Sequence, residues 1–341
     1  MFVLGIESSC DETAVSLVER GKRDRIIDEK IKSQIPLHKK YGGIVPEIAS
    51  RSHLEVIDNL TYDLLQDADK TINDIGLIAV TQGPGLIGSL LIGLAFAKGL
   101  SFSNNIPLVG VDHIHAHIES PFITNMNSIE YPLVALVVSG GHTSIFYLRS
   151  KFDITLFAST RDDAVGEVMD KVSKFMGLGY PGGPVLDRLY EKGDKNRYNF
   201  TFPRMSDGSD DFSFSGYKAA VLRTYRSGSI KNESDDFYGL ISSFLNSVTD
   251  YLILKLDDAV KRYDPKSIIV AGGVSRNSLL RKKLSGSFGP KNIDVFFPAD
   301  KYCTDNASMV GWLGYELFSF YPENNYFDKK INSYSRSRFI T

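Results

Sequence analysis

The fold of this chain is decided by residues 133–148, which read Leu-Val-Ala-Leu-Val-Val, Ser-Gly-Gly-His and Thr-Ser-Ile-Phe-Tyr-Leu. The two apolar runs are typical of β-strands, and the glycine-rich polar segment between them is typical of a turn. Residues 2–6 and 13–18 repeat the pattern around a polar loop at 7–12. The sequence therefore predicts two halves that each begin with a β-hairpin.

Duplicated halves that open with a hairpin whose turn can face phosphate resemble the actin, Hsp70 and sugar-kinase (ASKHA) architecture. This is an α/β fold of two lobes with an interlobe cleft, and a chain of 341 residues is long enough for two lobes. We expect lobe I over residues 1–131, closed by a C-terminal helix at 305–325. Lobe II is expected over residues 132–304, and a tail over residues 326–341.

Composition indicates an ordinary globular protein of the cytoplasm. Cys10 and Cys303 are the only cysteines, too few for a disulfide framework. The sequence predicts neither a secretory signal nor a membrane-spanning run of apolar residues, so no membrane partner is expected. With a formal net charge of −2, a nucleic-acid partner would need a local basic patch. The segment 22–25 and the tail around Arg336 and Arg338 are basic candidates.

Residues 111–117 read Val-Asp-His-Ile-His-Ala-His and contain three of the six histidines. In a helix, His113 and His117 share one face, whereas His115 points elsewhere and is left out of the site. Two imidazoles at this spacing can bind one divalent metal ion but need further ligands. Spacing alone leaves three carboxylates open as the third ligand, namely Asp305, Asp112 and Glu119.

Other segments of the sequence indicate secondary-structure elements and the junctions between them. Phe212 and Phe214 alternate with polar residues, which indicates a short strand or the wall of a pocket. His53 lies in a predicted helix and is interpreted as a packing or surface histidine. Residues 272–277 follow a buried strand with two glycines, a junction where a nucleotide can approach the backbone. Apolar spacing predicts further helices over residues 47–65, 164–176 and 236–263.

Taken together, the motifs resemble the TsaD (Gcp/YgjD) family, the tRNA N6-adenosine threonylcarbamoyltransferases. The similarity runs in order from residue 5 to residue 306. The matching stretches are 5–13 (Gly-Ile-Glu-Ser-Ser-Cys-Asp-Glu-Thr), 42–47, 83–86, 113–117, 138–143 (Val-Ser-Gly-Gly-His-Thr), 180–184 (Tyr-Pro-Gly-Gly-Pro), 212–216, 272–277 and 303–306 (Cys-Thr-Asp-Asn).

The resemblance implies one divalent metal ion per subunit, iron by preference with zinc as the alternative, bound by His113, His117 and Asp305. It also implies a pocket for threonylcarbamoyl-AMP. Carried onto this sequence, the pocket residues are Val137, Val138, Ser139, Gly140, Gly141, Asp170, Gly183, Asp187 and Asn277.

The implied reaction moves the threonylcarbamoyl group from the adenylate to N6 of adenosine 37, just 3′ of the anticodon, in tRNAs that read codons beginning with A. AMP is released. In bacteria the family works with a TsaB-like paralogue and a TsaE-like ATPase.

The chemistry adds roles for individual residues. An exocyclic amine needs a base, and Asp11 and Glu12 are the candidates in the first loop. The amides of Ser139 to Gly141 can cradle a phosphate. Asp112 could orient an imidazole as a hydrogen-bond partner.

Three alternatives stay open. A metallopeptidase of the O-sialoglycoprotein endopeptidase type would use the histidine pair, but Ile114 stands where the His-Glu-x-x-His motif places its glutamate. An ASKHA small-molecule kinase would share the lobes. A non-catalytic paralogue should lack the histidine pair and the 303–306 loop.

Overall fold

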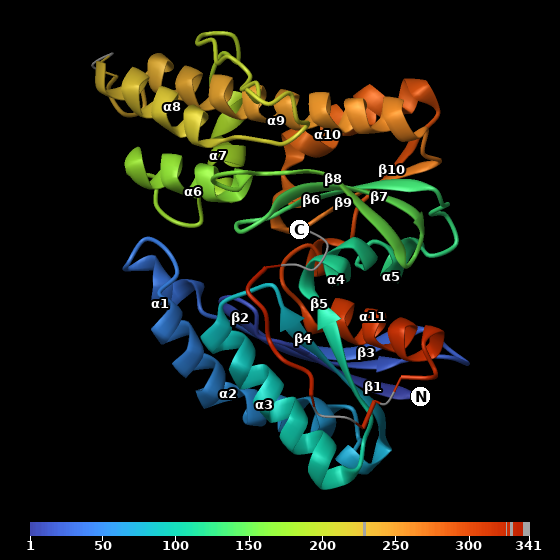
Figure 1. Cartoon of the computed structure of the whole chain (residues 1–341). Helices are drawn as coiled ribbons and strands as arrows, with labels where there is room; N and C mark the ends of the chain where they lie inside the picture. The colour runs from blue at the N-terminus through green and yellow to red at the C-terminus, as the bar shows by residue number, and fades with distance from the viewer. Residues whose placement is uncertain (228–229, 325, 328–329, 337–341) are drawn as a thin grey trace. The chain divides into compact units, whose positions relative to one another are not determined.

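A computed structural model describes residues 1–227, 230–324, 326–327 and 330–336 of the chain (Figure 1). The chain divides into two compact units. Unit 1 contains residues 1–126 together with the chain from residue 304 onward, and unit 2 contains residues 127–303. Each unit is built on one five-stranded mixed sheet.

The two sheets have the same topology. Unit 1 has the order β3-β2-β1-β4-β5, and unit 2 has the order β8-β7-β6-β9-β10. In both, the first strand is antiparallel to the second and parallel to the fourth. The strands of unit 1 are β1 (Phe2–Glu7), β2 (Glu12–Glu19), β3 (Arg25–Ser33), β4 (Ile75–Gly83) and β5 (Leu108–Asp112). Those of unit 2 are β6 (Leu133–Val138), β7 (Thr143–Ser150), β8 (Asp153–Ser159), β9 (Ser267–Ala271) and β10 (Asp294–Phe296). The predicted duplication of an α/β unit that begins with a hairpin is confirmed.

Helices cover the sheets, and the helices predicted over residues 47–65, 164–176 and 236–263 are confirmed as α2, α6 and α9 (Figure 1). Unit 1 contains α1 (Ile35–Lys39), α2 (Pro46–Asp67), α3 (Ile87–Asn104), α4 (His113–Glu119), α5 (Phe122–Asn125) and α11 (Ala307–Phe320). Unit 2 contains α6 (Val165–Phe175), α7 (Gly182–Leu189), α8 (Ser215–Ser227), α9 (Asp235–Tyr263) and α10 (Ser278–Phe288). The 3-10 turns are η1 (Ile72–Asp74), η2 (Tyr190–Lys192), η3 (Gly273–Arg276), η4 (Gly289–Lys291) and η5 (Asp300–Tyr302).

Both faces of the sheet of unit 1 are covered by helices. Successive side chains of β1 point to opposite sides, so this strand contributes to both faces. Leu4 and Ile6 join the apolar core that α2 and α3 complete. Gly5 faces α11 instead, and a Cβ at this position would lie 2.3 Å from the carbonyl oxygen of Ala307. Glycine therefore lets α11, from the far end of the sequence, lie directly on the first strand.

Helix α3 departs from the expectation that no segment could span a membrane. By length and composition alone it is apolar enough to do so. In unit 1, however, it packs against α2 and β4. Leu90, Leu94 and Ala97 are buried on its inner side. About one third of the helix is buried in this way, so packing within unit 1 accounts for part of its apolar character.

The Phe212 and Phe214 segment is not a strand. Phe212 makes only an isolated bridge with Thr160, and α8 begins directly after Phe214. Both rings are buried and contact Tyr251 of α9, at centroid distances of 5.7 and 5.6 Å. The alternation thus reflects two core anchors on an irregular segment, and the strand prediction was wrong.

Substituting Gly5 tests the contact between β1 and α11. Gly5→Ala should lower the free energy of unfolding by about 1–3 kcal/mol, because the new methyl group overlaps the backbone of α11. Gly99→Ala is the matched control. Gly99 lies exposed inside α3 with open space around it, so alanine should stabilise the helix by about 0.5–1 kcal/mol. Thermal unfolding of both variants measures the difference. Equal stability of Gly5→Ala and Gly99→Ala would contradict the packing argument.

Candidate functional site

The histidine segment forms the short helix α4 at the end of β5, as the spacing predicted. Asp112 caps this helix, since its Oδ1 accepts hydrogen bonds from the amides of Ile114 at 2.9 Å and His115 at 3.1 Å. The whole helix is buried. His113 and His117 share one face, and their ring centroids lie 4.6 Å apart.

Asp305 lies beside this pair of rings. Its Oδ1 is 3.1 Å from Nε2 of His117 and 3.5 Å from Nε2 of His113. One ligand atom from each of the three residues lies within 4.8 Å of the others. Asp305 is held there because Asn306, the next residue, caps α11 through a hydrogen bond from the amide of Met309. His115 is not part of this group.

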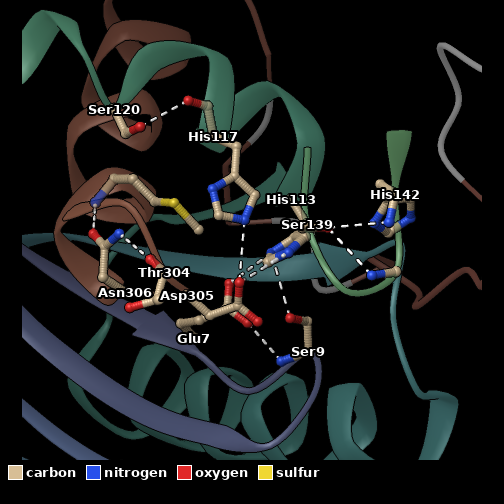
Figure 2. Close-up of polar contacts among 12 residues, drawn as sticks. Glu7, Ser9, His113, His117, Ser120, Ser139, His142, Thr304, Asp305 and Asn306 are labelled. Carbon is tan, nitrogen blue, oxygen red and sulfur yellow. Dashed lines mark hydrogen bonds and ion pairs between the residues drawn. The ribbon is translucent and has the colours of Figure 1, made fainter. Parts of the chain in front are cut away.

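The carboxylate that orients His113 is Glu7, at the end of β1 (Figure 2). Nδ1 of His113 donates to Glu7 Oε2 at 3.1 Å, which turns Nε2 toward Asp305. Glu7 also accepts from the amide of Ser9 and the hydroxyl of Thr81, both at 2.5 Å. Asp112, the carboxylate expected in this role, caps the helix instead. A metal-binding histidine held by a second carboxylate in this way is common in metalloproteins.

Charge in this group favours a cation. Burial alone would raise the pKa of Glu7, but the charge and hydrogen bond of His113 lower it below its ordinary value. Burial alone would lower the pKa of His113, but Glu7 and Asp305 raise it to about 9. Burial lowers the pKa of His117, so this ring stays neutral, which is the form that binds a metal. Two imidazoles and a carboxylate are a donor set that suits zinc or iron.

Asp11 and Glu12 lie in the same unit, on the loop between β1 and β2. Asp11 is buried, and the hydroxyl of Ser33 donates to Glu12 Oε1 at 3.2 Å. Burial raises the pKa of both carboxyls, and the charge of Asp11 raises that of Glu12 further. The hydrogen bond between them lowers the pKa of Asp11 and raises the pKa of Glu12, which favours a shared proton on Glu12. Burial also raises the pKa of the neighbouring Cys10 thiol, which makes it a poor nucleophile.

In unit 2, the β6–β7 turn meets the start of α6 and the end of β9. Val137 and Val138 end β6, buried in the sheet, and the turn at 139–142 follows. The amide of Gly166 in α6 donates to the carbonyl of Ser139 at 3.2 Å. A Cβ at Gly272 would lie 2.4 Å from the carbonyl oxygen of Val138, so only glycine allows these two strand ends to come this close.

The remaining predicted residues of unit 2 connect α6, α7 and α10. Asp170 accepts from the amide of Gly182 at 2.6 Å, next to Gly183. Asp187 accepts from the amide of Ser278 at 3.0 Å and from its hydroxyl at 2.9 Å. Asn277 caps α10 through the amide of Leu280. These contacts and those around Ser139 link the predicted pocket residues in one continuous series within unit 2.

Sequence reasoning missed Glu7, Ser9 and Thr81. The signal was present in part, since Glu7 is a carboxylate that directly follows a buried strand. Its partners on β4 and α4 are 74 and 106 residues away, however, and only the sheet register brings them to it.

Comparison with known proteins points to one family. The TsaD family of tRNA N6-adenosine threonylcarbamoyltransferases matches residues 25–312. The protein of that name from Fusobacterium nucleatum is 46% identical over 315 residues, which make up 92% of this chain and 91% of the relative. The one from Bacillus subtilis is 47% identical over 317 residues, with 92% and 90% covered.

Solved structures of low identity share the fold alone. HypF of T. kodakarensis superposes with a TM-score of 0.61 at 13% identity, over 94% of this chain and 48% of HypF. Component A of the (R)-2-hydroxyglutaryl-CoA dehydratase of Acidaminococcus fermentans gives 0.54 at 13% identity, over 94% and 99% of the two chains.

The family match decides among the alternatives, because it covers most of the chain, whereas the peptidase and kinase hypotheses rested on the histidine pair and on the fold. The chain belongs to the TsaD family, the tRNA N6-adenosine threonylcarbamoyltransferases, and is an enzyme of the transferase class.

Proposed function

We propose that this enzyme transfers the threonylcarbamoyl group of threonylcarbamoyl-AMP to N6 of adenosine 37, just 3′ of the anticodon, in tRNAs that read codons beginning with A. AMP is the leaving group. The observation that carries the proposal is family membership over most of the chain. The group formed by His113, His117 and Asp305 supports it, since acyl transfer needs charge stabilisation at the reacting carbonyl.

His113, His117 and Asp305 would hold one divalent cation, iron by preference and zinc as the alternative. When bound, the cation would supply a Lewis acid for an oxygen of the threonylcarbamoyl group. His113 would give up the proton on its Nε2 when the cation binds. Glu7 would keep the remaining proton on Nδ1, so that the lone pair of Nε2 faces the cation. The same hydrogen bond fixes the orientation of the ring.

The adenylate half of the donor would bind in unit 2. The turn at 139–142 lies beside the start of α6, and such a turn favours a phosphate. Within it, the amide of Ser139 donates to the carbonyl of His142 at 2.8 Å and the amide of Gly141 donates to the hydroxyl of Ser139 at 3.3 Å. The amide of Gly140 is therefore the group of the Ser139–Gly141 segment that we assign to the phosphate. Asp170 and Asp187 already accept amide hydrogen bonds from Gly182 and Ser278. We therefore assign them the task of holding the 182–183 turn and the start of α10 in place. Val137, Val138, Gly183 and Asn277 complete the proposed pocket.

Asp11 is the proposed base for the adenine amine. A carboxylate with a pKa raised by burial is a stronger base than one in water. Glu12 would donate a hydrogen bond to Asp11 and keep its reactive oxygen in place.

The proposed partners are tRNA, threonylcarbamoyl-AMP and, if the source is bacterial, a TsaB-like paralogue and a TsaE-like ATPase. Both cysteines are free, which suits the cytoplasm. Because the net charge is −2, the tRNA surface must be local or shared with a partner. Lys22, Arg23 and Arg336 are exposed basic side chains, whereas Arg338 lies outside the described residues.

Direct transfer is tested by mixing the purified protein and its partners with threonine, bicarbonate, ATP and unmodified tRNA. Mass spectrometry of the tRNA nucleosides should show threonylcarbamoyladenosine. A second reaction supplies preformed threonylcarbamoyl-AMP in place of its precursors. If tRNA stays unmodified in both reactions while the partners are active with another family member, the proposal is wrong.

The two carboxyls have different expected effects. Asp11→Asn should slow transfer by about 10²-fold or more, because the base is lost. Glu12→Gln should cost much less, because its amide can still donate a hydrogen bond to Asp11. Single-turnover rates with threonylcarbamoyl-AMP measure both, with metal content as the control. Wild-type rates in both variants would remove these residues from the mechanism.

The metal group is tested through Glu7. Glu7→Gln should weaken metal binding by about 10–100-fold, because the amide no longer supplies the charged acceptor for His113. His113→Ala and Asp305→Ala should abolish binding at micromolar metal. His115→Ala is the matched control, since His115 lies on the same buried helix outside the ligand group, and it should bind as the wild type does. Titration of metal-free protein with iron(II) or zinc measures affinity, and unchanged affinity in Asp305→Ala would overturn the assignment.

A further inference from the structure

Unit 1 contains a second pair of buried histidines that the proposed reaction does not use. His38 lies in α1 and His53 in α2, and both are completely buried. Neither belongs to the group of metal-ligating residues found in the described part of the chain. Both lie close to the loop that carries Asp11 and Glu12.

His53 bridges the two residues that flank the carboxyl pair. Its Nε2 lies 3.0 Å from the carbonyl oxygen of Cys10, and its Nδ1 lies 2.7 Å from the hydroxyl of Thr13. A carbonyl oxygen can only accept, so Nε2 carries the proton and donates it to this bond. Burial lowers the pKa of His53 and keeps the ring neutral, so Nδ1 accepts from the hydroxyl of Thr13. One imidazole thus holds the loop on either side of Asp11 and Glu12.

Gln34 extends the hydrogen-bond network behind this ring. The backbone amide of Gln34 donates to the carbonyl of Asp11 at 2.9 Å. Nε2 of its side chain lies 3.4 Å from both ring nitrogens of His53. Its Oε1 accepts from Nε2 of His38 at 3.2 Å. Nδ1 of His38 in turn accepts from the amide of Val45, where α2 begins. The loop is therefore tied to the start of α2 through buried side chains.

We propose that His53 is a positioning residue for the transfer reaction, and that it acts by holding the Asp11–Glu12 loop through Cys10 and Thr13. The inference rests on the proposed role of Asp11 as the base. An apolar side chain at position 53 would leave the part-buried carbonyl of Cys10 and the buried hydroxyl of Thr13 without this partner, and the loop would shift to satisfy them. A small displacement of a base costs catalytic rate rather than substrate affinity.

Two substitutions of His53 separate the effect of its hydrogen bond from the effect of its side-chain volume. His53→Leu fills a similar space but cannot donate, whereas the amide of His53→Gln can reach the carbonyl of Cys10. We expect His53→Leu to lower kcat by about 10–100-fold, with KM for tRNA and for threonylcarbamoyl-AMP and the metal content unchanged. His53→Gln should recover most of the loss. Thr61→Val is the matched control, because its buried hydroxyl donates to the carbonyl of Ile57 in the same helix, and it should leave kcat unchanged.

A double substitution tests whether His53 acts through the base. In the Asp11→Asn background, His53→Leu should cause no further loss, because there is no base left to misplace. Losses that multiply would overturn the inference, as would a wild-type kcat in His53→Leu or equal losses in the Leu and Gln variants. If His53→Leu does not fold, Thr13→Val removes the second bond of the ring and should lower kcat in the same direction; an unchanged kcat there would also overturn it.

The outcomes distinguish this inference from the proposed function. Wild-type rates in both Asp11→Asn and Glu12→Gln would refute the base, whatever His53 does. If Asp11→Asn is slow and His53→Leu transfers at the wild-type rate, only the positioning role of His53 is refuted.

Discussion

The arrangement of the candidate metal-binding group in unit 1 depends on one buried carboxylate, that of Glu7. It has no exposed surface, and a buried carboxylate is strongly destabilising unless charge and hydrogen bonds compensate it. Its partners come from three elements: Ser9 after β1, Thr81 on β4 and His113 at the start of α4. Satisfying this single group therefore holds the ends of two strands and the start of α4 together.

The same carboxylate makes His113 suitable as a ligand. By accepting the proton on Nδ1 it leaves Nε2 directed at Asp305, which comes from a segment 192 positions along the chain from His113. That segment is placed by α11, which lies on β1 because Gly5 has no side chain. A glycine in the first strand and a cap at Asn306 thus decide where Asp305, the proposed third ligand, lies. The ligand group is a product of sheet packing and helix capping rather than of local sequence.

Much of the fold could be predicted from the sequence. The two hairpins, the duplication and the helices α2, α6 and α9 follow from apolar periodicity, which is a local signal. Phe212 and Phe214 were misread, because alternation marks two anchors in an aromatic core as readily as it marks a strand. From the sequence, α3 was not expected to be apolar enough to span a membrane, because small and polar residues interrupt its apolar ones. Glycines, alanines and serines, interspersed with its leucines and isoleucines, are suited to close packing in unit 1.

By itself, the sequence predicted the residues proposed to carry the chemistry, namely the histidine pair at i and i+4 and the carboxylates of the first loop. It also supplied the ordered motifs of the TsaD family. Tertiary structure decided how these residues are held. It assigned the orientation of His113 to Glu7 and gave Asp112 the cap of α4. It also placed His53, which the sequence offered only as a packing or surface residue, against Cys10 and Thr13. The physical reason is that helix spacing is set by neighbouring residues, whereas the partners of a buried polar group are set by strand register and by helices packed from distant parts of the chain.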